Sequence, residues 1–215
     1  MIILIGGEKG GTGKTTIATN LAAMRIKSRD TLLVDTDSQG SASNWTLLRD
    51  DNQITPRIPC IQKFGRSIRQ ECKSLQEKYE DIIIDAGGRD SPELRAALTI
   101  ADITVCPLRP SQFDLWTLAR MNSLVQEIKE EVNPKLKVWI LINQAPTNPS
   151  VKEVEEAKLI VGEREFEFLN IFNTVLFERI VFRKAAVTGG AIFEIDYQDA
   201  KATAELELLY KEIYL

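Results

Sequence analysis

Six short apolar segments recur along the chain, and longer helix-like stretches separate them. The segments are MIILI, TLLVD, DIIID, DITVCPL, KVWILIN and IFNTVLF. They are rich in Ile, Val and Leu and do not alternate with polar residues, as expected of strands buried on both faces. Helices are predicted between them, at residues 14–28, 41–49, 65–79, 91–101, 111–131, 150–165 and 198–213. This rhythm predicts an α/β fold with a doubly wound, mostly parallel sheet flanked by helices.

Prolines support two of the predicted helix starts. Ser91-Pro92-Glu93 and Asn148-Pro149-Ser150 each place a proline where the first helical residue belongs. Residues 50–65 fit neither pattern, and we expect a loop there with one edge strand. No change of composition divides the 215 residues, which predicts a single domain over residues 1–215.

The composition excludes a protein that is cationic over its whole surface. The formal net charge is −4 and the isoelectric point is about 5.2, so any contact with nucleic acid must come from a local basic patch. No apolar run is long enough to span a membrane, and MIILIGG is too short and too uncharged for a signal peptide. We therefore expect a cytoplasmic protein.

The residue types available for chemistry favour phosphoryl transfer. The chain has no histidine, which removes the commonest general base. Its three cysteines are an odd number at wide spacing and offer neither a disulfide framework nor a metal-binding pair: Cys60, Cys72 and Cys106. Carboxylates, lysines, hydroxyls and a bound ion are left to do the chemistry.

The stretch GGEKGGTGKTT, residues 6–16, predicts a phosphate-binding loop between a strand and a helix. Its glycines allow a tight turn whose backbone amides point at phosphate oxygens, and the helix N-terminus adds its positive dipole end. Lys14 would neutralise the β and γ phosphates, and Thr15 would offer its hydroxyl to Mg²⁺. The predicted nucleotide-binding residues of this loop are Lys9, Gly10, Gly11, Thr12, Gly13, Lys14, Thr15 and Thr16. One departure from the general pattern is Glu8, which stands where the first glycine is expected.

That departure, together with Lys9, resembles the deviant Walker A motif of the ParA/MinD family of P-loop ATPases. In that family an early lysine crosses the interface of an ATP-sandwiched dimer and contacts the phosphates bound by the other subunit. Lys9 matches this lysine by position. The resemblance therefore implies the P-loop NTPase fold, ATP as cofactor, an ATP-dependent homodimer and a catalytic role for Lys9 beside Lys14.

Two acidic segments complete the resemblance around the phosphates. In TLLVDTDSQG, Asp35 and Asp37 are spaced to point the same way at the carboxyl end of a strand, and the segment resembles the family's Walker A′ motif. By resemblance, Asp37 would orient or activate the attacking water. The alternative is that both carboxylates merely cap the next turn.

DIIIDAGG resembles a Walker B motif, in which Asp85 reaches Mg²⁺ directly or through water. The implied magnesium ligands are Thr15, Asp37 and Asp85. The family more often has Asp-Thr-Pro-Pro where this chain has Asp85-Ala86-Gly87-Gly88, so the conformation of this second switch stays open.

The resemblance extends along nearly the whole chain. Residues 101–118 follow the family pattern of a strand, a proline-flanked turn and a helix at the dimer face, and residues 177–213 resemble its C-terminal segment. Asn143 and Gln144 stand at a strand end where the family contacts adenine. The guanine-selecting Asn-Lys-x-Asp pattern is absent there, which favours ATP over GTP. The small size is most similar to the short plasmid-partition ATPases.

Two basic clusters are candidates for contact with nonspecific DNA, which the resemblance implies as a partner. One is Arg66, Arg69 and Lys73 at helical spacing, and the favoured one is Arg179, Arg183 and Lys184. Each is also compatible with a solvated face. The C-terminal residues 196–215 carry more acidic than basic side chains, which argues against the membrane anchoring of MinD relatives.

The resemblance implies a nucleoid-associated partition ATPase that hydrolyses ATP slowly and is stimulated by a centromere- or cargo-binding adaptor. Plasmid, chromosome and protein compartment remain open as cargo. A metabolic ligase or synthetase of the same fold is the alternative from another class, with a MinD-like membrane ATPase as a second. An iron–sulfur ATPase is disfavoured because Cys106 has no suitable companion.

Overall fold

The computed structural model describes residues 1–111, 116–148, 152–162 and 166–215. Within them, seven strands form one all-parallel sheet in the order β3-β2-β4-β1-β5-β6-β7. The strands are β1 Ile2–Ile5, β2 Thr31–Asp35, β3 Cys60–Gln62, β4 Asp81–Asp85, β5 Ile103–Leu108, β6 Lys137–Ala145 and β7 Asn170–Phe177. All six predicted strands are confirmed, and β3 is the edge strand expected within residues 50–65.

The helices follow the predicted alternation; most are shorter than predicted, whereas α2 extends two residues beyond its predicted end. They are α1 Lys14–Arg25, α2 Ser41–Asp51, η1 Gly65–Ser67, α3 Ile68–Leu75, α4 Pro92–Leu98, α6 Leu118–Glu131, α7 Glu153–Gly162, α8 Ile180–Ala186 and α9 Ala200–Tyr214. The start predicted at Ser91 is confirmed, because the Ser91 side chain accepts a hydrogen bond from the Leu94 N–H. The start predicted at Pro149 lies outside the described residues. Helix α8 was not predicted, because two turns are too short to show a clear helical period.

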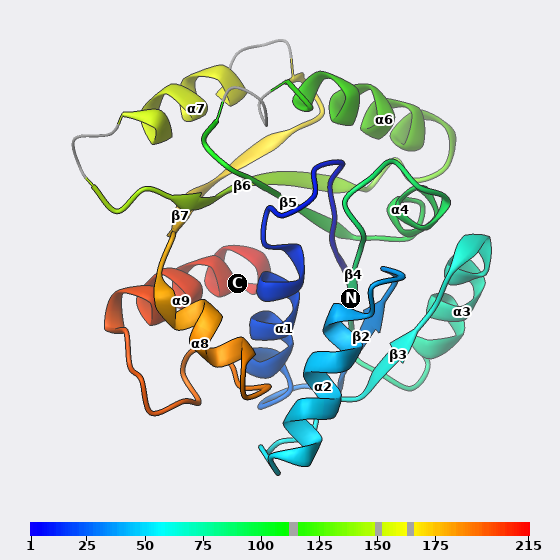
Figure 1. Cartoon of the computed structure of the whole chain (residues 1–215). Helices are drawn as coiled ribbons and strands as arrows, with labels where there is room; N and C mark the ends of the chain where they lie inside the picture. Colours follow the sequence, from blue (N-terminus) through cyan, green and yellow to red (C-terminus); the bar gives the residue numbers. More distant parts are fainter. Residues whose placement is uncertain (112–115, 149–151, 163–165) are drawn as a thin grey trace.

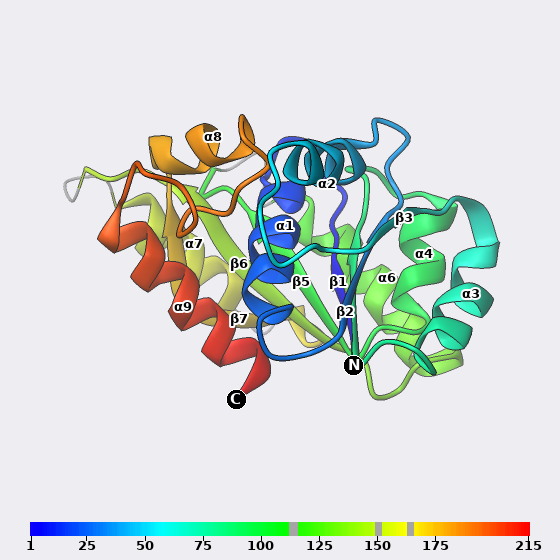
Figure 2. The same ribbon diagram turned by 90° about the horizontal axis from the view of Figure 1, so that it is seen from below.

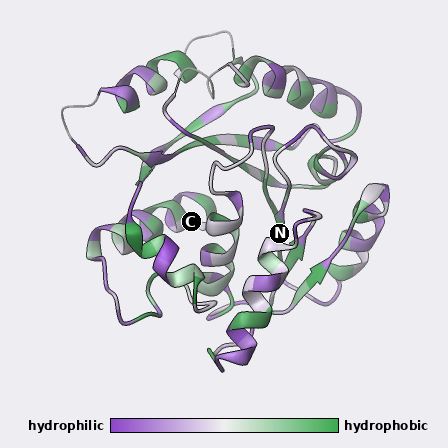
Figure 3. Ribbon diagram, viewed as in Figure 1, coloured by the Kyte–Doolittle hydropathy of each residue, from purple (hydrophilic) through white to green (hydrophobic). Residues whose placement is uncertain are grey.

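Alternate side chains of each strand enter two separate cores. Ile2 and Leu4 of β1 belong to one core, whereas Ile3 and Ile5 belong to the other. Helices α3, α4, α6 and α7 cover the first face, and α1, α2, α8 and α9 cover the second (Figures 1 and 2). The hydrophobic strands lie between helices that carry polar residues on their outer sides (Figure 3). This is the doubly wound arrangement that unalternated apolar strands predict.

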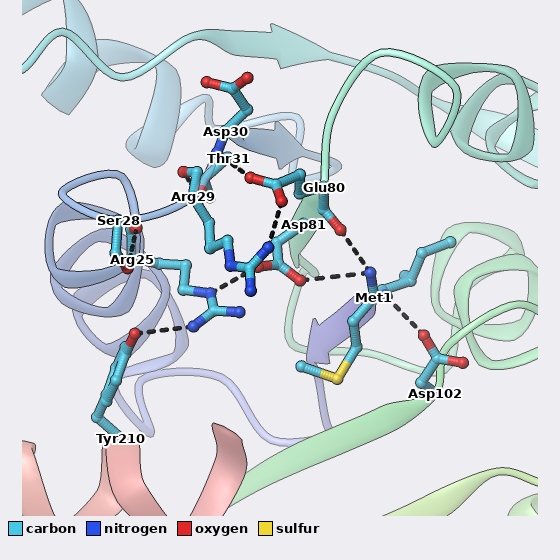
Figure 4. Close-up of polar contacts among 11 residues, drawn as sticks. Met1, Arg25, Ser28, Arg29, Asp30, Thr31, Glu80, Asp81, Asp102 and Tyr210 are labelled. Carbon is cyan, nitrogen blue, oxygen red and sulfur yellow. Dashed lines mark hydrogen bonds and ion pairs between the residues drawn. The ribbon is translucent and has the colours of Figure 1, made fainter. Parts of the chain in front are cut away.

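A polar cluster ties three elements together at the amino end of the strands (Figure 4). Arg25, at the end of α1, donates to the buried Asp81 carboxylate of β4 at 2.5 Å and to the Tyr210 hydroxyl of α9 at 3.0 Å. The Met1 amino group lies 3.3 Å from the other Asp81 oxygen. The Arg25 guanidinium also stacks 4.2 Å from the centre of the Tyr214 ring. This end of the sheet is therefore closed by side chains, and the carboxyl end is the one available to a ligand.

Candidate functional site

The glycine-rich loop turns sharply between β1 and α1. Gly11 and Gly13 have φ angles of +73° and +87°, which glycine adopts without steric cost. A Cβ on Gly13 would stand 2.4 Å from the Asn143 amide nitrogen, which itself donates to the Thr12 carbonyl at 2.7 Å. The end of β6 thus holds the loop closed against the start of α1.

Lys14 lies inside this loop. Its ammonium group donates to the Lys9 carbonyl at 2.6 Å, and the residue is almost completely buried. Burial lowers the pKa of Lys14, and the charges of Asp85, Cys106 and Asp37 act in the opposite direction. The Lys9 side chain, in contrast, is exposed to solvent at the rim of the loop. The two lysines of the motif therefore occupy different environments although they lie one turn of chain apart.

Thr15 and Asp85 meet beneath the loop. The Thr15 hydroxyl donates to one Asp85 carboxylate oxygen at 2.7 Å, at the point where β4 ends beside β1. The other oxygen, Oδ1, is buried and has no hydrogen-bond partner among the described residues. Burial raises the pKa of Asp85 to about 7; the Thr15 hydrogen bond and the Lys14 charge oppose this, while Asp35 and Asp37 add to it.

A hydroxyl and an unsatisfied carboxylate oxygen are hard ligands that suit Mg²⁺. No cluster of three or more Asp, Glu, Cys or His side chains forms a metal site in the part of the chain that the structure describes. Magnesium usually takes the rest of its ligands from phosphates and water in phosphoryl-transfer sites. The residues present thus fit the ion that the loop motif implies.

Asp35 and Asp37 have different surroundings, contrary to the expectation that both point into the site. Asp35 is completely buried, and its carboxylate accepts the backbone N–H groups of Asp37 at 3.1 Å and Ser43 at 2.9 Å. The capping alternative is therefore correct for Asp35. Strand β2 ends at Asp35, so the alternation of a strand does not continue to Asp37. Asp37 is partly exposed, and its carboxylate accepts the Gln39 N–H at 3.0 Å.

The loop after β4 packs directly on the phosphate loop. A Cβ on Gly88 would stand 2.6 Å from the Gly10 Cα and 3.0 Å from the Lys9 carbonyl oxygen. A Cβ on Gly87 would come within 3.4 Å of an Asp37 carboxylate oxygen. The close approach to Gly10 therefore requires glycine at position 88, whereas a Cβ at position 87 would make an ordinary van der Waals contact. A pocket of about 510 Å³ opens beside them, lined among others by Gly10, Asp37 and Gly88.

A second pocket, of about 320 Å³, lies on the other side of the phosphate loop, between the end of β6 and α8. Its walls include Asn143, Gln144, Phe177 and Phe182, so the predicted base-contacting residues do line one cavity. Arg109 also lines it, donating to the Gln144 side-chain oxygen and to the Gly11 carbonyl, each at 2.5 Å. Sequence reasoning missed Arg109. Its place directly after β5, the neighbour of β1, is the signal that indicates it.

The basic residues proposed for DNA do not form one cluster of three free cations. Arg179 is paired with Glu205 at 2.6 Å and lies 4.0 Å from Asp199, so the carboxylates near α9 balance its charge. Arg183 is exposed on α8, and the Lys184 ammonium sits 3.5 Å above the Tyr197 ring. The other cluster, on η1 and α3, lies on the opposite face of the sheet.

Comparison with known proteins gives the family. The CobQ/CobB/MinD/ParA nucleotide-binding domain family matches residues 3–186 of this chain. The maintenance of carboxysome distribution protein A of Halothiobacillus neapolitanus is 24% identical over 98% of this chain and 95% of its own length.

Solved structures agree on the fold. The ATP complex of a Cyanothece McdA variant has a TM-score of 0.79 at 17% identity and covers 98% of this chain and 95% of that one. The septum site-determining protein MinD of Pyrococcus horikoshii, solved with Mg-ADP, has a TM-score of 0.72 at 19% identity and covers 99% and 95%. Among the described residues, no helix combines the length and the apolar character that a membrane crossing requires. With its phosphate loop, Thr15–Asp85 pair and sheet order, this chain belongs to the ParA/MinD family of P-loop ATPases.

Proposed function

We propose that this ATPase partitions or positions a cellular cargo. It forms a homodimer around two ATP·Mg²⁺, binds DNA of any sequence in that state, and releases it after slow hydrolysis that an adaptor stimulates. The name of the similar carboxysome distribution protein states such a role. The cargo is a plasmid, a chromosome or a protein compartment, and the protein associates with the nucleoid.

The observation that carries the proposal is the separation of the two lysines. Lys14 is buried in the loop of its own chain, where its ammonium group already lies against the Lys9 carbonyl. The exposed Lys9 side chain adds a second cation at the rim. A cation at the rim is well placed to neutralise phosphate charge across a two-fold axis, because a symmetric dimer brings each rim to the partner's nucleotide.

The residues divide the chemistry of hydrolysis among themselves. Backbone amides from Gly10 to Thr16 receive the phosphates, and Lys14 exchanges the Lys9 carbonyl for phosphate oxygens. Thr15 and Asp85 would hold Mg²⁺, which would supply positive charge to offset that of the phosphates. Asp37 lies next to Gly87, beside the pocket at the loop's mouth, and orients the attacking water.

The second pocket takes the adenine base. The Asn143 amide nitrogen donates one of its two protons to the Thr12 carbonyl, and its side-chain oxygen is an acceptor that it can offer to a base. An acceptor suits adenine, whose exocyclic amino group donates, and opposes guanine, which carries an acceptor at the same place. Phe177 and Phe182 supply apolar walls for the ring.

DNA is bound by the surface around α8. Arg183 and Lys184 contribute the cations, and Arg179 contributes less because Glu205 neutralises it. The bond between DNA and such cations weakens as the salt concentration rises, because each phosphate contact releases counterions.

The test is a mass measurement by light scattering together with binding to long random-sequence DNA, without nucleotide, with ADP and with ATP·Mg²⁺. We expect the mass to double and DNA binding to begin only with ATP. A protein that stays monomeric and does not bind DNA in any of the three states would refute the proposal and favour a ligase of the CobQ/CobB type. ATP-dependent binding to anionic vesicles would instead favour a membrane-surface ATPase.

A further inference from the structure

A pocket of about 490 Å³ lies away from the nucleotide site, among η1, α3, α4 and α6. These elements cover the same face of the sheet, with α3 beside α4 and α6 next to α4 (Figure 1). Three arginines, one each from η1, α3 and α4, line it: Arg66, Arg69 and Arg95. Part of its wall is apolar, formed by Pro92, Ala96 and Ile128.

The arginines differ in how their charge is balanced. Arg95 is held by the Asp90 carboxylate through two hydrogen bonds of 2.7 and 2.8 Å, and a Glu127 oxygen lies 3.4 Å away. Arg66 and Arg69 are exposed and form no ion pair within the residues that the structure describes. Two guanidinium groups without a carboxylate therefore face the pocket, next to a third that is already paired.

We propose that this pocket receives an acidic peptide segment of a partner protein, with carboxylates on Arg66 and Arg69. Guanidinium groups bind carboxylates through paired, charge-assisted hydrogen bonds, and the apolar wall accommodates the aliphatic part of a side chain. A nucleic-acid backbone fits less well, because it brings closely spaced phosphates against the carboxylates of Asp90 and Glu127. A peptide places its charges at the arginines and neutral groups opposite those carboxylates.

The pocket is joined to the nucleotide site by one short segment. Ser91 lines this pocket and also the pocket that contains Asp37 and Gly88. Gly88 packs on Gly10 without room for a Cβ, and Asp90, two residues later, is anchored to Arg95 in α4. A ligand that moves α4 or competes for Arg95 therefore shifts the loop that touches the phosphate loop. We infer that the acidic segment changes nucleotide turnover, a step that rests on the proposed partner stimulation.

The binding test uses a short dye-labelled peptide in which glutamates alternate with neutral alanines, and measures its fluorescence anisotropy at about 0.15 M salt, where long-range attraction is screened. The double variant Arg66→Gln/Arg69→Gln should weaken binding about tenfold or more, because two charge-assisted contacts are lost. Lys73→Gln is the matched control, since Lys73 is exposed on the same helix but does not line the pocket. Equal affinity of the double variant and the unchanged protein would overturn the proposal, as would equal binding of the same peptide with glutamine in place of each glutamate.

Two further measurements distinguish a peptide site from a nucleic-acid site and test the coupling to nucleotide release. If random-sequence DNA binds through Arg66 and Arg69 while the peptide does not, the surface is a nucleic-acid site and the proposal fails. With the peptide saturating, release of a fluorescent ATP analogue should change about threefold or more in the unchanged protein and not in the double variant. An unchanged release rate would overturn the coupling. Failure of ATP-dependent dimerisation would refute the proposed function and leave the peptide affinity as it is, so the two failures are distinguishable.

Discussion

Gly88 of the loop after β4 rests on Gly10 of the phosphate loop, and a Cβ on Gly88 would stand 2.6 Å from the Gly10 Cα. The position of a Cβ is fixed by its own backbone, and the Gly10 Cα is a backbone atom. Rotation of a side chain therefore cannot relieve the overlap. The contact joins the two segments that would enclose the γ-phosphate. It also explains why glycine stands at position 88, where the family more often has a larger residue.

Gly88→Ala should therefore separate the two loops. We expect ATP hydrolysis to fall about tenfold or more, with a loss of about 1–3 kcal/mol in the free energy of unfolding from the overpacking. Thermal unfolding and a steady-state ATPase assay measure the two effects. Gly162→Ala is the control, because a Cβ there meets none of the described residues within 4 Å. A Gly88→Ala protein with full activity would show that the contact has no role in catalysis.

Lys9→Ala should abolish the ATP-dependent doubling of mass and leave nucleotide binding by the monomer. The reason is that Lys14, not Lys9, is the cation buried in the loop of the same chain, and the Lys9 carbonyl that holds it is unchanged by the substitution. Light scattering and titration with a fluorescent ATP analogue measure the two properties. Lys73→Ala serves as the control for the loss of an exposed lysine. A Lys9→Ala protein that still dimerises with ATP would disprove a contact across the interface.

Asp37→Ala should trap the ATP-bound dimer on DNA. Asp37 lines the pocket beside Gly10 and Gly88, so its removal takes away the group that orients water and leaves the binding groups in place. Hydrolysis should fall by about a hundredfold, a typical effect of losing a general base or water-orienting group. Dissociation from DNA after a chase with ADP measures the trap. Rapid release from the variant would exclude this role for Asp37.

Asp85 predicts a pH dependence of stability in the metal-free protein. Burial raises its pKa to about 7 in the folded state, above the usual value near 3.8 of the unfolded chain. Between these values the folded protein binds more protons, so the free energy of unfolding should fall as the pH rises from about 4 to about 7. Denaturant unfolding in EDTA measures this slope.

Asp85→Asn is the matching variant. In the unchanged protein the free energy of unfolding should fall by roughly 2–4 kcal/mol between pH 4 and pH 7, and the variant should lose most of this fall. Mg²⁺ with ATP should also reduce the slope, because a cation stabilises the ionised carboxylate. A slope that is identical in the unchanged protein and the variant would assign the pH dependence to other groups.

Arg25→Ala should destabilise the protein by about 2–4 kcal/mol, because it leaves the buried Asp81 carboxylate without its guanidinium partner. It also removes the hydrogen bond to Tyr210 and the stacking on Tyr214. The matched control is Arg29→Ala in the same cluster (Figure 4), because Arg29 and Glu80 form an exposed pair. We expect a much smaller change there. Equal effects of the two variants in urea unfolding would contradict the importance of burial.

The sequence by itself determined the strands and the phosphate chemistry. Apolar runs such as DIIID form buried strands wherever both faces are covered, so their pattern is a local property. The phosphate-binding motif is also a local property, because its glycines, lysine and hydroxyls all lie within the short segment from Gly10 to Thr16. The meeting of Thr15 with Asp85 was also expected, because parallel strands bring their carboxyl ends to one edge.

Only the tertiary structure decided which charged side chains are free to act. The Asp35 carboxylate accepts the Ser43 N–H, eight residues later, and so caps α2. The charge of Arg179 is neutralised by Glu205 of α9. Arg109 reaches Gly11 across the sheet, and Gly88 meets Gly10 from a different loop. Each of these outcomes depends on which residue distant in the chain lies within bonding distance, and packing sets that distance. The sequence therefore identified the candidate side chains, and the tertiary contacts of each side chain determined whether it is available for binding or catalysis.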